Sequence, residues 1–287
     1  MMQYLAMSQI RLESIRKTFA LGRGTPFTAL NGLDLTVDRG TFVSLVGPSG
    51  CGKSTLLNLI AGFDFPDEGS VTVDGRPVSG PGPGRVVVFQ EPALFPWLSL
   101  VDNVAFGLRQ RKVPRDRRLA RAREQLQAVH LGRFADRFPH ELSGGMKQRA
   151  AIARALALDP DILLMDEPFG ALDEQTKFVL QKDLEELWLR SGKTVVFVTH
   201  NIREALVLSD RVVVMGTLPG RIKREVTVSS PRPRNATDPD LVRLESIIME
   251  DLAEELEKVL QQELDFEYHL AKDSLPHPAR HSVGSGI

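Results

Sequence analysis

The sequence predicts an α/β protein built around a parallel β-sheet that has helices on both faces. Short runs of continuously apolar, largely β-branched residues recur along the 287-residue chain. Continuous apolarity is typical of strands that are covered on both faces. The predicted strands are TFVSLVG from Thr41, RVVVFQ from Arg85, DILLMDE from Asp161, KTVVFVTH from Lys193 and DRVVVMG from Asp210.

The early part of the chain predicts a separate antiparallel β subdomain. The stretch LDLTVDRG, from Leu33, alternates apolar and polar residues with a period of two. The stretch SVTVDGRPV carries Asp74 and Gly75 between two extended arms, which is a hairpin signal. We therefore expect an antiparallel subdomain that precedes or flanks the parallel core.

Residues 91–160 predict an inserted α-helical subdomain. Between Gln90 and Pro160 the strand pattern stops, and residues 109–138 are dense in basic residues and good helix formers. We expect one large domain over residues 8–230 with this helical insertion inside it.

Residues 231–287 predict a linker, an amphipathic helix and a flexible tail. The stretch SSPRPRNATDPD, from Ser229, has the proline, serine and asparagine content of a linker. The stretch KDSLPHPARHSVGSGI, from Lys272, is typical of a loose tail. Between them, apolar residues recur mostly at three- and four-residue steps, at Leu241, Leu244, Ile248, Leu252, Leu256, Val259 and Leu264.

Composition narrows the class of protein. There are 36 Lys and Arg against 37 Asp and Glu, a net charge of −1, which argues against a surface built entirely for nucleic acid. The single cysteine, Cys51, cannot form an internal disulfide, so a reducing cytoplasmic setting is expected. No run reaches the roughly 18 apolar residues of a membrane span, so we expect a soluble chain that meets a membrane only through a partner.

The stretch GPSGCGKST predicts a phosphate-binding loop. It fits G-x-x-x-x-G-K-[ST] and lies between an apolar strand and a helical segment, the context that this motif requires. Lys53 is expected to neutralise the β and γ phosphates, Ser54 to bind Mg²⁺ and Thr55 to bond the α phosphate. The alternative is a chance glycine-rich turn. The predicted nucleotide contacts are Gly47, Pro48, Ser49, Gly50, Cys51, Gly52, Lys53, Ser54 and Thr55.

Two acidic residues follow another apolar strand. Asp166 and Glu167 end the stretch DILLMDE, and ligands of open α/β sheets bind at the carboxyl ends of strands. Asp166 is a candidate for the magnesium shell, and Glu167 is a candidate base that orients water. The alternative is a strand exit followed by a helix cap.

Four stretches in chain order, GPSGCGKST, LSGGMKQR, DILLMDEPFGALD and VVFVTH, resemble the motif set of the ATP-binding cassette (ABC) ATPases, which have a P-loop NTPase core. The resemblance covers Ile10 to about Val228 and implies hydrolysis of ATP with Mg²⁺. It implies Glu167 as the catalytic base, His200 as the γ-phosphate sensor and Gln90 as a contact of Mg²⁺ or of the attacking water. It also implies that Phe19 stacks on adenine. A Gln90 that satisfies loop backbone, a structural His200 and a core Phe19 are the alternatives.

The resemblance also explains a second glycine pair, in LSGGMKQR. It implies that two copies pair head to tail, so that Ser143, Gly144 and Gly145 bind the γ-phosphate held by the other copy, with Asp173 linking the two sites. Glycine is expected there because a Cβ would hold the backbone away from phosphate. The alternative role of the serine and glycines is a capped helix start.

The stretch VVFQEPALFPWLSLVDNVAFGL, with THNIREAL and PGRI, resembles the subfamily that serves nitrate, sulfonate and taurine importers. That resemblance implies a homodimer on integral-membrane permease subunits, supplied indirectly by a solute-binding protein, at the cytoplasmic face of the inner membrane. Phe95 and Trp97 are expected to contact the permease; the alternative is a subdomain core.

Two other classes of function stay open at this point. A nucleic-acid-associated cassette ATPase would use the basic run Arg109–Arg123, but the sequence has no zinc cysteines and no second cassette. A nucleotide-binding interaction subunit without turnover would not need Glu167 and His200. Modification of Cys51 is also expected to crowd the phosphates and weaken ATP binding.

Overall fold

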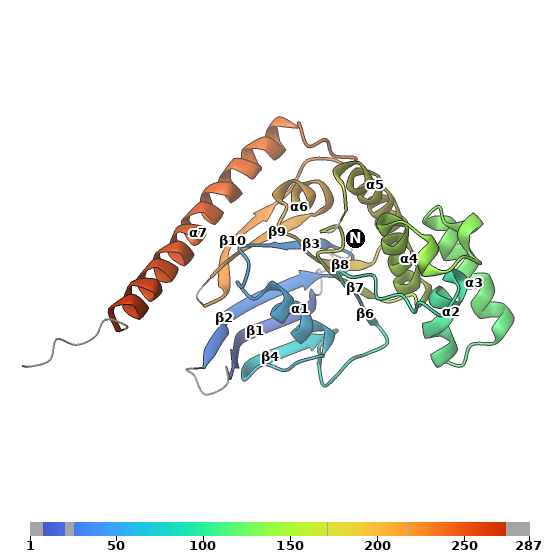
Figure 1. Cartoon of the computed structure of the whole chain (residues 1–287), viewed down its shortest axis with the longest axis horizontal. Helices are drawn as coiled ribbons and strands as arrows, with labels where there is room; N and C mark the ends of the chain where they lie inside the picture. The colour runs from blue at the N-terminus through green and yellow to red at the C-terminus, as the bar shows by residue number, and fades with distance from the viewer. Residues whose placement is uncertain (1–7, 21–25, 171, 218, 274–287) are drawn as a thin grey trace, which may run out of the picture.

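The computed structural model describes residues 8–20, 26–170, 172–217 and 219–273, and contains two β-sheets (Figure 1). A four-stranded antiparallel sheet has the order β2-β1-β4-β5, and a six-stranded sheet has the order β10-β9-β3-β8-β7-β6. The strands of the first sheet are β1 (Ser8–Phe19), β2 (Phe27–Asp38), β4 (Glu68–Val73) and β5 (Arg76–Pro77). Those of the second are β3 (Phe42–Val46), β6 (Arg85–Val88), β7 (Ile162–Asp166), β8 (Thr194–Val198), β9 (Arg211–Gly216) and β10 (Arg221–Thr227).

The five predicted apolar runs are the five parallel strands of the larger sheet, which confirms the fold class. Every residue of β3 and β8 is buried, as continuous apolarity requires. Strand β10 was not predicted. It pairs antiparallel with β9, and of its seven residues only Val226 is fully buried, so it carries no apolar run.

The smaller sheet contains the predicted hairpin. Asp74 and Gly75 have φ angles of 51° and 71°, so both central residues of the turn are in the left-handed region that a two-residue hairpin favours. The turn joins β4 to β5, which pair antiparallel. Strand β2 alternates buried and exposed residues, so only one face of this sheet is covered.

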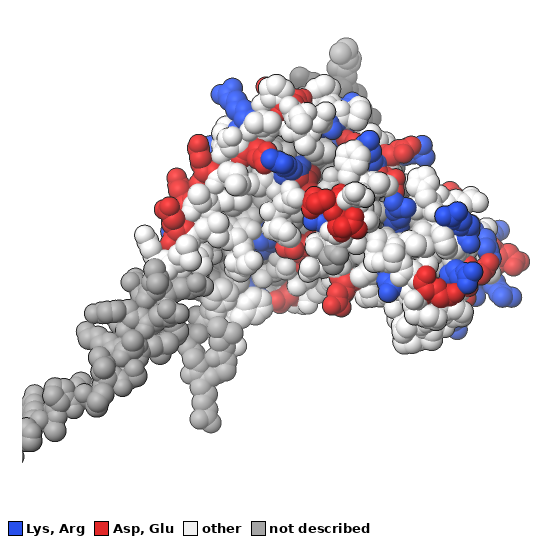
Figure 2. Space-filling view, turned by 45° about the horizontal axis from the view of Figure 1, so that its top comes forward, with Lys and Arg blue, Asp and Glu red and all other residues white. Residues whose placement is uncertain are grey.

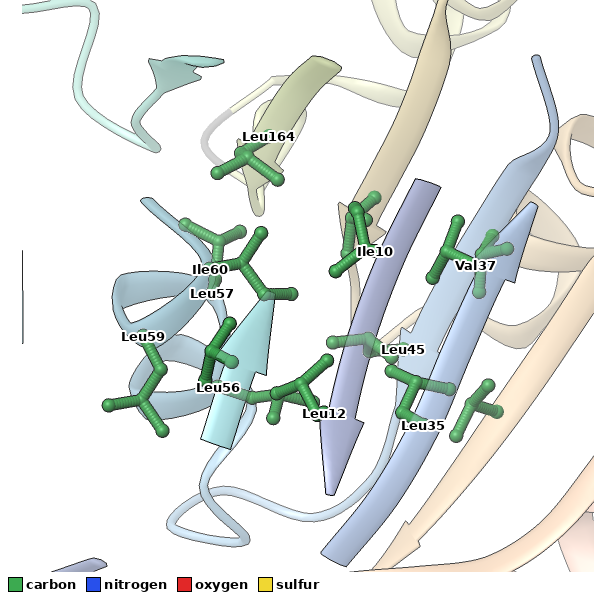
Figure 3. Packing of buried hydrophobic residues seen from close by; sticks show 14 of the residues in the cluster. Ile10, Leu12, Leu35, Val37, Leu45, Leu56, Leu57, Leu59, Ile60 and Leu164 are labelled. Carbon is green, nitrogen blue, oxygen red and sulfur yellow. The ribbon is translucent and has the colours of Figure 1, made fainter. Parts of the chain in front are cut away.

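Helix α1 (Lys53–Ala61) packs between the two sheets. Figure 3 shows its leucines, including Leu56 and Leu57, among side chains from both sheets such as Leu12 and Leu45. Burial of this contiguous apolar surface stabilises the start of α1, where the phosphate-binding loop ends.

The opposite face of the larger sheet is covered by α4 (Gly144–Ala157) and α5 (Glu174–Ser191). Helix α4 also belongs to a helical unit with α2 (Leu100–Gln110) and α3 (Arg115–Ala128), which has its own apolar core. This unit projects to the right of the sheets in Figure 1. The predicted helical content of residues 91–160 is therefore observed, with 3₁₀ turns at Gly132–Phe134 and Pro139–Glu141.

The segment predicted as a linker is attached to the domain. Arg232 contacts the carboxylates of Glu185 at 3.0 Å and Asp210 at 2.8 Å, and its guanidinium lies 4.5 Å from the Trp188 ring centroid. Arg234 donates to the Val228 carbonyl at 2.9 Å. Burial, assisted by Arg232, lowers the pKa of Arg234 to about 10. The segment is held in place by Arg232 and Arg234, which bond to groups of the domain. The proline and serine content of the segment does not reveal these contacts.

The predicted amphipathic helix is α7 (Pro239–Asp273), which follows α6 (Ile202–Leu208). Leu241 and Ile248 are buried against the domain, but Leu256 is half exposed, contrary to the predicted apolar face. Glu255 is buried instead, because its carboxylate accepts the Thr217 N–H at 2.9 Å and contacts the Lys258 ammonium at 2.5 Å. The predicted tail began at Lys272, but Lys272 and Asp273 are the last two residues of α7. The rest of the predicted tail, residues 274–287, lies outside the described residues.

Within the described ranges, no helix is both long and apolar enough to cross a membrane.

Candidate functional site

The glycine-rich loop after β3 is shaped by close packing beneath it. A Cβ added at Gly47 would lie 2.6 Å from Sγ of Cys51 and 2.8 Å from the Met215 carbonyl oxygen. Gly52 has a φ of 92°, and a Cβ there would lie 2.6 Å from Cδ2 of Leu30. Helix α1 then begins at Lys53 with no side-chain cap and no acidic residue in its first turn. Its first N–H groups are therefore available to an anion.

The ammonium of Lys53 is held over this loop. Its Nζ donates to the carbonyl oxygens of Gly47 at 2.8 Å and Pro48 at 2.9 Å, and the side chain is buried. Within the described ranges no carboxylate forms an ion pair with it. The loop thus presents a desolvated positive charge that phosphate oxygens would neutralise.

Cys51 lies under the loop. Its Sγ is 3.6 Å from Nζ of Lys53, and the side chain is fully buried. Burial raises the pKa of the thiol, although Lys53 opposes the shift, so the reactive thiolate is scarce at neutral pH. The expected sensitivity of ATP binding to thiol modification is not supported, because the sulfur is neither exposed nor activated.

Two oxygen atoms that could bind a metal ion lie close together where β7 ends. The Ser54 hydroxyl donates to Oδ1 of Asp166 at 3.2 Å. Burial raises the pKa of Asp166; the Ser54 hydrogen bond and Lys53 oppose that shift, and the nearby Glu167 charge adds to it. Hydroxyl and carboxylate oxygens side by side are the donors that Mg²⁺ prefers, and a divalent cation would relieve the desolvated charge.

Glu167 and His200 meet above the same sheet edge. Oε2 of Glu167 is 3.1 Å from Nδ1 of His200, and the Glu167 N–H donates to the Val198 carbonyl at 2.9 Å. Glu167 has a φ of 44°, a left-handed conformation that is strained for a residue with a side chain and is enriched at functional sites. The loop after β8 is fixed because Asn201 caps α6 through the N–H groups of Arg203 and Glu204.

Gln90 borders the same place. A Cβ added at Gly170 would lie 3.0 Å from Nε2 of Gln90 and 3.5 Å from Oε2 of Glu167. Both side chains therefore flank Gly170. The structure brings Gln90, which is exposed, to the edge that holds Glu167 and His200.

The phosphate-binding loop opens onto a cavity of about 330 Å³ that Phe19 lines together with Glu167. Nζ of Lys17 lies 5.3 Å from the centroid of the Phe19 ring. Phe27 and Ala29 line the cavity too and were missed by sequence reasoning. Phe27 is the strand partner of Phe19 across β1 and β2, so only the register of that pair could have revealed it.

Ser143, Gly144 and Gly145 are not among the residues that line this cavity. Ser143 caps α4 by accepting the Met146 N–H at 3.3 Å. A Cβ at Gly145 would lie 2.5 Å from Cγ2 of Thr176, whereas one at Gly144 would make an ordinary 3.7 Å contact. The expected reason for glycine is therefore incomplete, because packing inside the chain already requires it at 145.

Asp173 caps α5 within the same copy. Its carboxylate accepts the Thr176 N–H at 2.9 Å and the Thr176 hydroxyl at 2.7 Å. These hydrogen bonds lower the pKa of Asp173. Thr176 thus joins Asp173 to Gly145, a connection that sequence reasoning did not anticipate.

Helix α4 is also bonded to the loop that follows Gln90. Arg154 donates to the carbonyl oxygens of Pro92 at 2.8 Å and Ala93 at 2.7 Å, and Gln148 donates to the Phe89 carbonyl at 3.3 Å. Sequence reasoning missed Arg154 and Gln148 because their partners are backbone atoms about 60 positions away. Helix α4 is therefore hydrogen-bonded to the backbone on both sides of Gln90.

Comparison with known proteins agrees with this geometry. Residues 30–170 match the family model described as ABC transporter. A taurine import ATP-binding protein of Burkholderia pseudomallei is 43% identical over 88% of this chain and 100% of its own length. A bicarbonate transport ATP-binding protein of Synechococcus elongatus is 48% identical over 80% of this chain, which spans only 35% of that longer relative.

Solved structures give the same answer for the fold. The dimeric post-hydrolysis state of an ATP-binding cassette bound to ADP and Pi has a TM-score of 0.68 and 36% identity, and the match covers 77% of this chain and 100% of that one. This likeness confirms the expected P-loop ABC ATPase core. The chain belongs to the ABC transporter family.

Proposed function

We propose that this chain is the ATP-hydrolysing subunit of an importer for a small solute, and that two copies work as a pair. The observation that carries the proposal is the meeting of Glu167 and His200 at 3.1 Å beside the phosphate-binding loop. A subunit that only binds nucleotide needs the loop but has no use for a general base at the γ-phosphate position.

ATP is bound by charge and by backbone donors. The N–H groups at the start of α1 and the ammonium of Lys53 surround the phosphates, while Phe19 and Phe27 flank the adenine. Mg²⁺ would be held by Ser54, Asp166 and Gln90, and when bound it neutralises charge that develops on the phosphates. Thr55 bonds the α phosphate.

Hydrolysis uses Glu167 as the base. A water oxygen attacks the γ-phosphorus, the bond from that phosphorus to the β–γ bridging oxygen breaks, and Glu167 takes the proton from the water. His200 orients the Glu167 carboxylate through its 3.1 Å contact and also senses the γ-phosphate. Loss of the γ-phosphate removes the anion on which Glu167 and His200 act.

The site is completed by a second copy. Ser143, Gly144 and Gly145 lie at the N-terminus of α4, which has no acidic residue in its first turn, yet they do not line their own cavity. Placed over the γ-phosphate of the other copy, this terminus adds N–H donors and a favourable dipole. ATP therefore favours the closed pair and ADP the open one.

The permease subunits dock beside the loop after Gln90. An apolar cavity of about 410 Å³, lined by residues that include Phe95, Phe106 and Leu158, opens there. Phe95 packs on Phe106 with ring centroids 4.5 Å apart, so it is partly subdomain core, while Trp97 is largely exposed. Arg154 connects this surface to α4, so that a change at the γ-phosphate reaches the permease.

The transported solute is a small anion. The relatives named for taurine and bicarbonate transport support this class, because bicarbonate is a small anion and taurine carries an anionic sulfonate group. A solute-binding protein delivers the anion to the permease. The chain itself works as a peripheral subunit at the cytoplasmic face of the inner membrane.

Binding of nucleic acid is not favoured. Several arginines of the basic run already have partners: Arg121 contacts Glu124 at 2.9 Å, and Arg123 contacts Asp136 at 3.1 Å. In Figure 2, basic and acidic side chains are interspersed over the face in view. A mixed surface of this kind does not provide the single-sign field that phosphate backbones attract.

The test is isolation of the complex from its native membrane, followed by identification of the co-purifying subunits and reconstitution into vesicles. We expect a permease, a solute receptor and ATP-dependent uptake of an anion, with nitrate, taurine and bicarbonate as first probes. Phosphate release without any co-purifying membrane subunit would refute the transport role, and absence of phosphate release would refute the enzymatic one.

A further inference from the structure

Helix α7 has two apolar faces, and only one of them is covered. Leu241 and Ile248 are buried against the domain. Asp251 and Glu255 fix the same face through Arg224 and Lys223 of β10. In Figure 1 the helix runs along the outer edge of the molecule, and no other described element lies on its outer side.

The outer face carries a stripe of large apolar side chains. Val242 is 46% exposed, Met249 56%, Leu256 50% and Leu260 57%. Their spacing is seven, seven and four residues, and the exposed Ser246 and Ala253 fill the remaining positions of the same heptad pattern. Isolated exposed leucines are ordinary, but apolar residues that repeat at heptad spacing along one exposed face are typical of the contact line of a coiled coil.

We propose that this outer stripe packs antiparallel against the same stripe of a second copy of this chain. The order of side-chain sizes supports that orientation. Antiparallel pairing sets Met249 against Ala253 of the second copy and Leu256 against Ser246 of the second copy. Large residues then face small ones. Parallel pairing would instead set the small Ser246 and Ala253 against themselves and leave gaps.

The charged residues that flank the stripe also favour a second copy of the chain in the antiparallel orientation. In the antiparallel arrangement Arg243 lies beside Glu257 of the second copy, twice by symmetry. One like-charge contact remains, between the two copies of Glu250. Parallel pairing would bring Glu245 beside Glu250 of the second copy, twice by symmetry. It would also give Arg243 no acidic neighbour on α7 of the second copy. All of these flanking positions lie on the described part of α7, and Arg243, Glu250 and Glu257 are exposed.

This contact does not involve the nucleotide, so it persists when ATP is absent. It would keep two copies together after the γ-phosphate has been lost and the ATP-bound interface has opened. The stripe is short, since the 18 residue steps from Val242 to Leu260 rise roughly 27 Å at 1.5 Å per residue. A modest affinity is therefore expected, one that tethers the copies without locking them.

The test is sedimentation equilibrium of the full chain without nucleotide. We expect a reversible dimer whose dissociation constant rises at least roughly tenfold in Met249→Asp, about 1.4 kcal/mol. Gln261→Asp adds the same charge to an exposed position off the stripe and should leave the dissociation constant unchanged. A wild-type chain that stays monomeric, or a Met249→Asp variant that dimerises normally, would overturn the proposal.

A charge exchange tests the orientation. Arg243→Glu and Glu257→Arg should each weaken the nucleotide-free dimer several-fold, and the double variant should restore it. A double variant no tighter than either single one would overturn the antiparallel arrangement. ATP-driven pairing, measured separately with Glu167→Gln, should survive Met249→Asp. Failure of one interface is thereby distinguished from failure of the other.

Discussion

Oε2 of Glu167 lies 3.1 Å from Nδ1 of His200. Glu167 directly follows β7, and His200 is the second residue after the neighbouring parallel strand β8. Parallel strands end at one edge of a sheet, so residues 33 positions apart become partners. The left-handed backbone of Glu167 turns the chain at that edge. This pair is the reason why we assign hydrolysis to the chain and not nucleotide binding alone.

Glu167→Gln removes the base and keeps the shape of the side chain. We expect phosphate release to fall at least roughly 10²-fold. ATP affinity should be nearly unchanged, and the ATP-bound pair should accumulate in size-exclusion chromatography. Glu124→Gln, on the surface of α3, is the matched control and should keep full activity. Normal turnover in Glu167→Gln would mean that another group accepts the proton.

Asp166→Asn tests the magnesium shell through pH and stability. Burial raises the folded-state pKa of Asp166, so its ionised form destabilises the nucleotide-free chain. That penalty is absent below the ordinary carboxyl range and grows as pH rises through the raised pKa. At neutral pH the variant should therefore melt no lower than the wild type, while Mg²⁺-dependent ATP affinity falls at least roughly tenfold. A variant that melts lower would show that the carboxylate stabilises the fold.

Gly145→Ala should destabilise the chain by about 1–3 kcal/mol, because its Cβ would lie 2.5 Å from Cγ2 of Thr176. Adding Thr176→Ser, which removes that methyl group and keeps the hydroxyl that bonds Asp173, should restore most of the melting temperature. Unfolding in urea measures both effects. No recovery in the double variant would show that the clash is not with Thr176.

Gly144→Ala separates the interface from the fold. Its Cβ would make only a 3.7 Å contact inside the chain, so stability should change by less than about 1 kcal/mol. ATP-driven pairing in the Glu167→Gln background should nevertheless weaken, because the added methyl group keeps the α4 N-terminus away from the partner's nucleotide. Unchanged pairing would argue against a γ-phosphate contact at this glycine.

Phe19→Ala and Phe27→Ala test the adenine side of the cavity. Stacking of one base on an aromatic ring is worth about 1–3 kcal/mol, so ATP affinity should fall roughly 5- to 150-fold in the variant whose ring contacts the base. Inorganic triphosphate, which has no base, should bind both variants like the wild type. Equal loss for ATP and triphosphate would indicate damage to the loop and not to stacking.

Much of the fold and of the site could be predicted from local patterns in the sequence. The five parallel strands were predicted because burial on both faces demands continuous apolarity, and the hairpin at Asp74 because its turn needs left-handed residues. The phosphate-binding loop was predicted because its chemistry requires glycines, a lysine and a hydroxyl at fixed spacing. Such constraints act over a few neighbouring residues, so they are visible in one chain.

Only the tertiary structure decided the contacts between distant segments. The pairing of Phe27 with Phe19 depends on strand register, the need for glycine at 145 depends on Thr176, and the fixing of Arg232 depends on Glu185 and Asp210. Burial of Glu255 in place of Leu256 likewise depends on partners in β10 and α7. Each of these is a packing or charge relation whose second member lies elsewhere in the chain, and folding alone brings the two together.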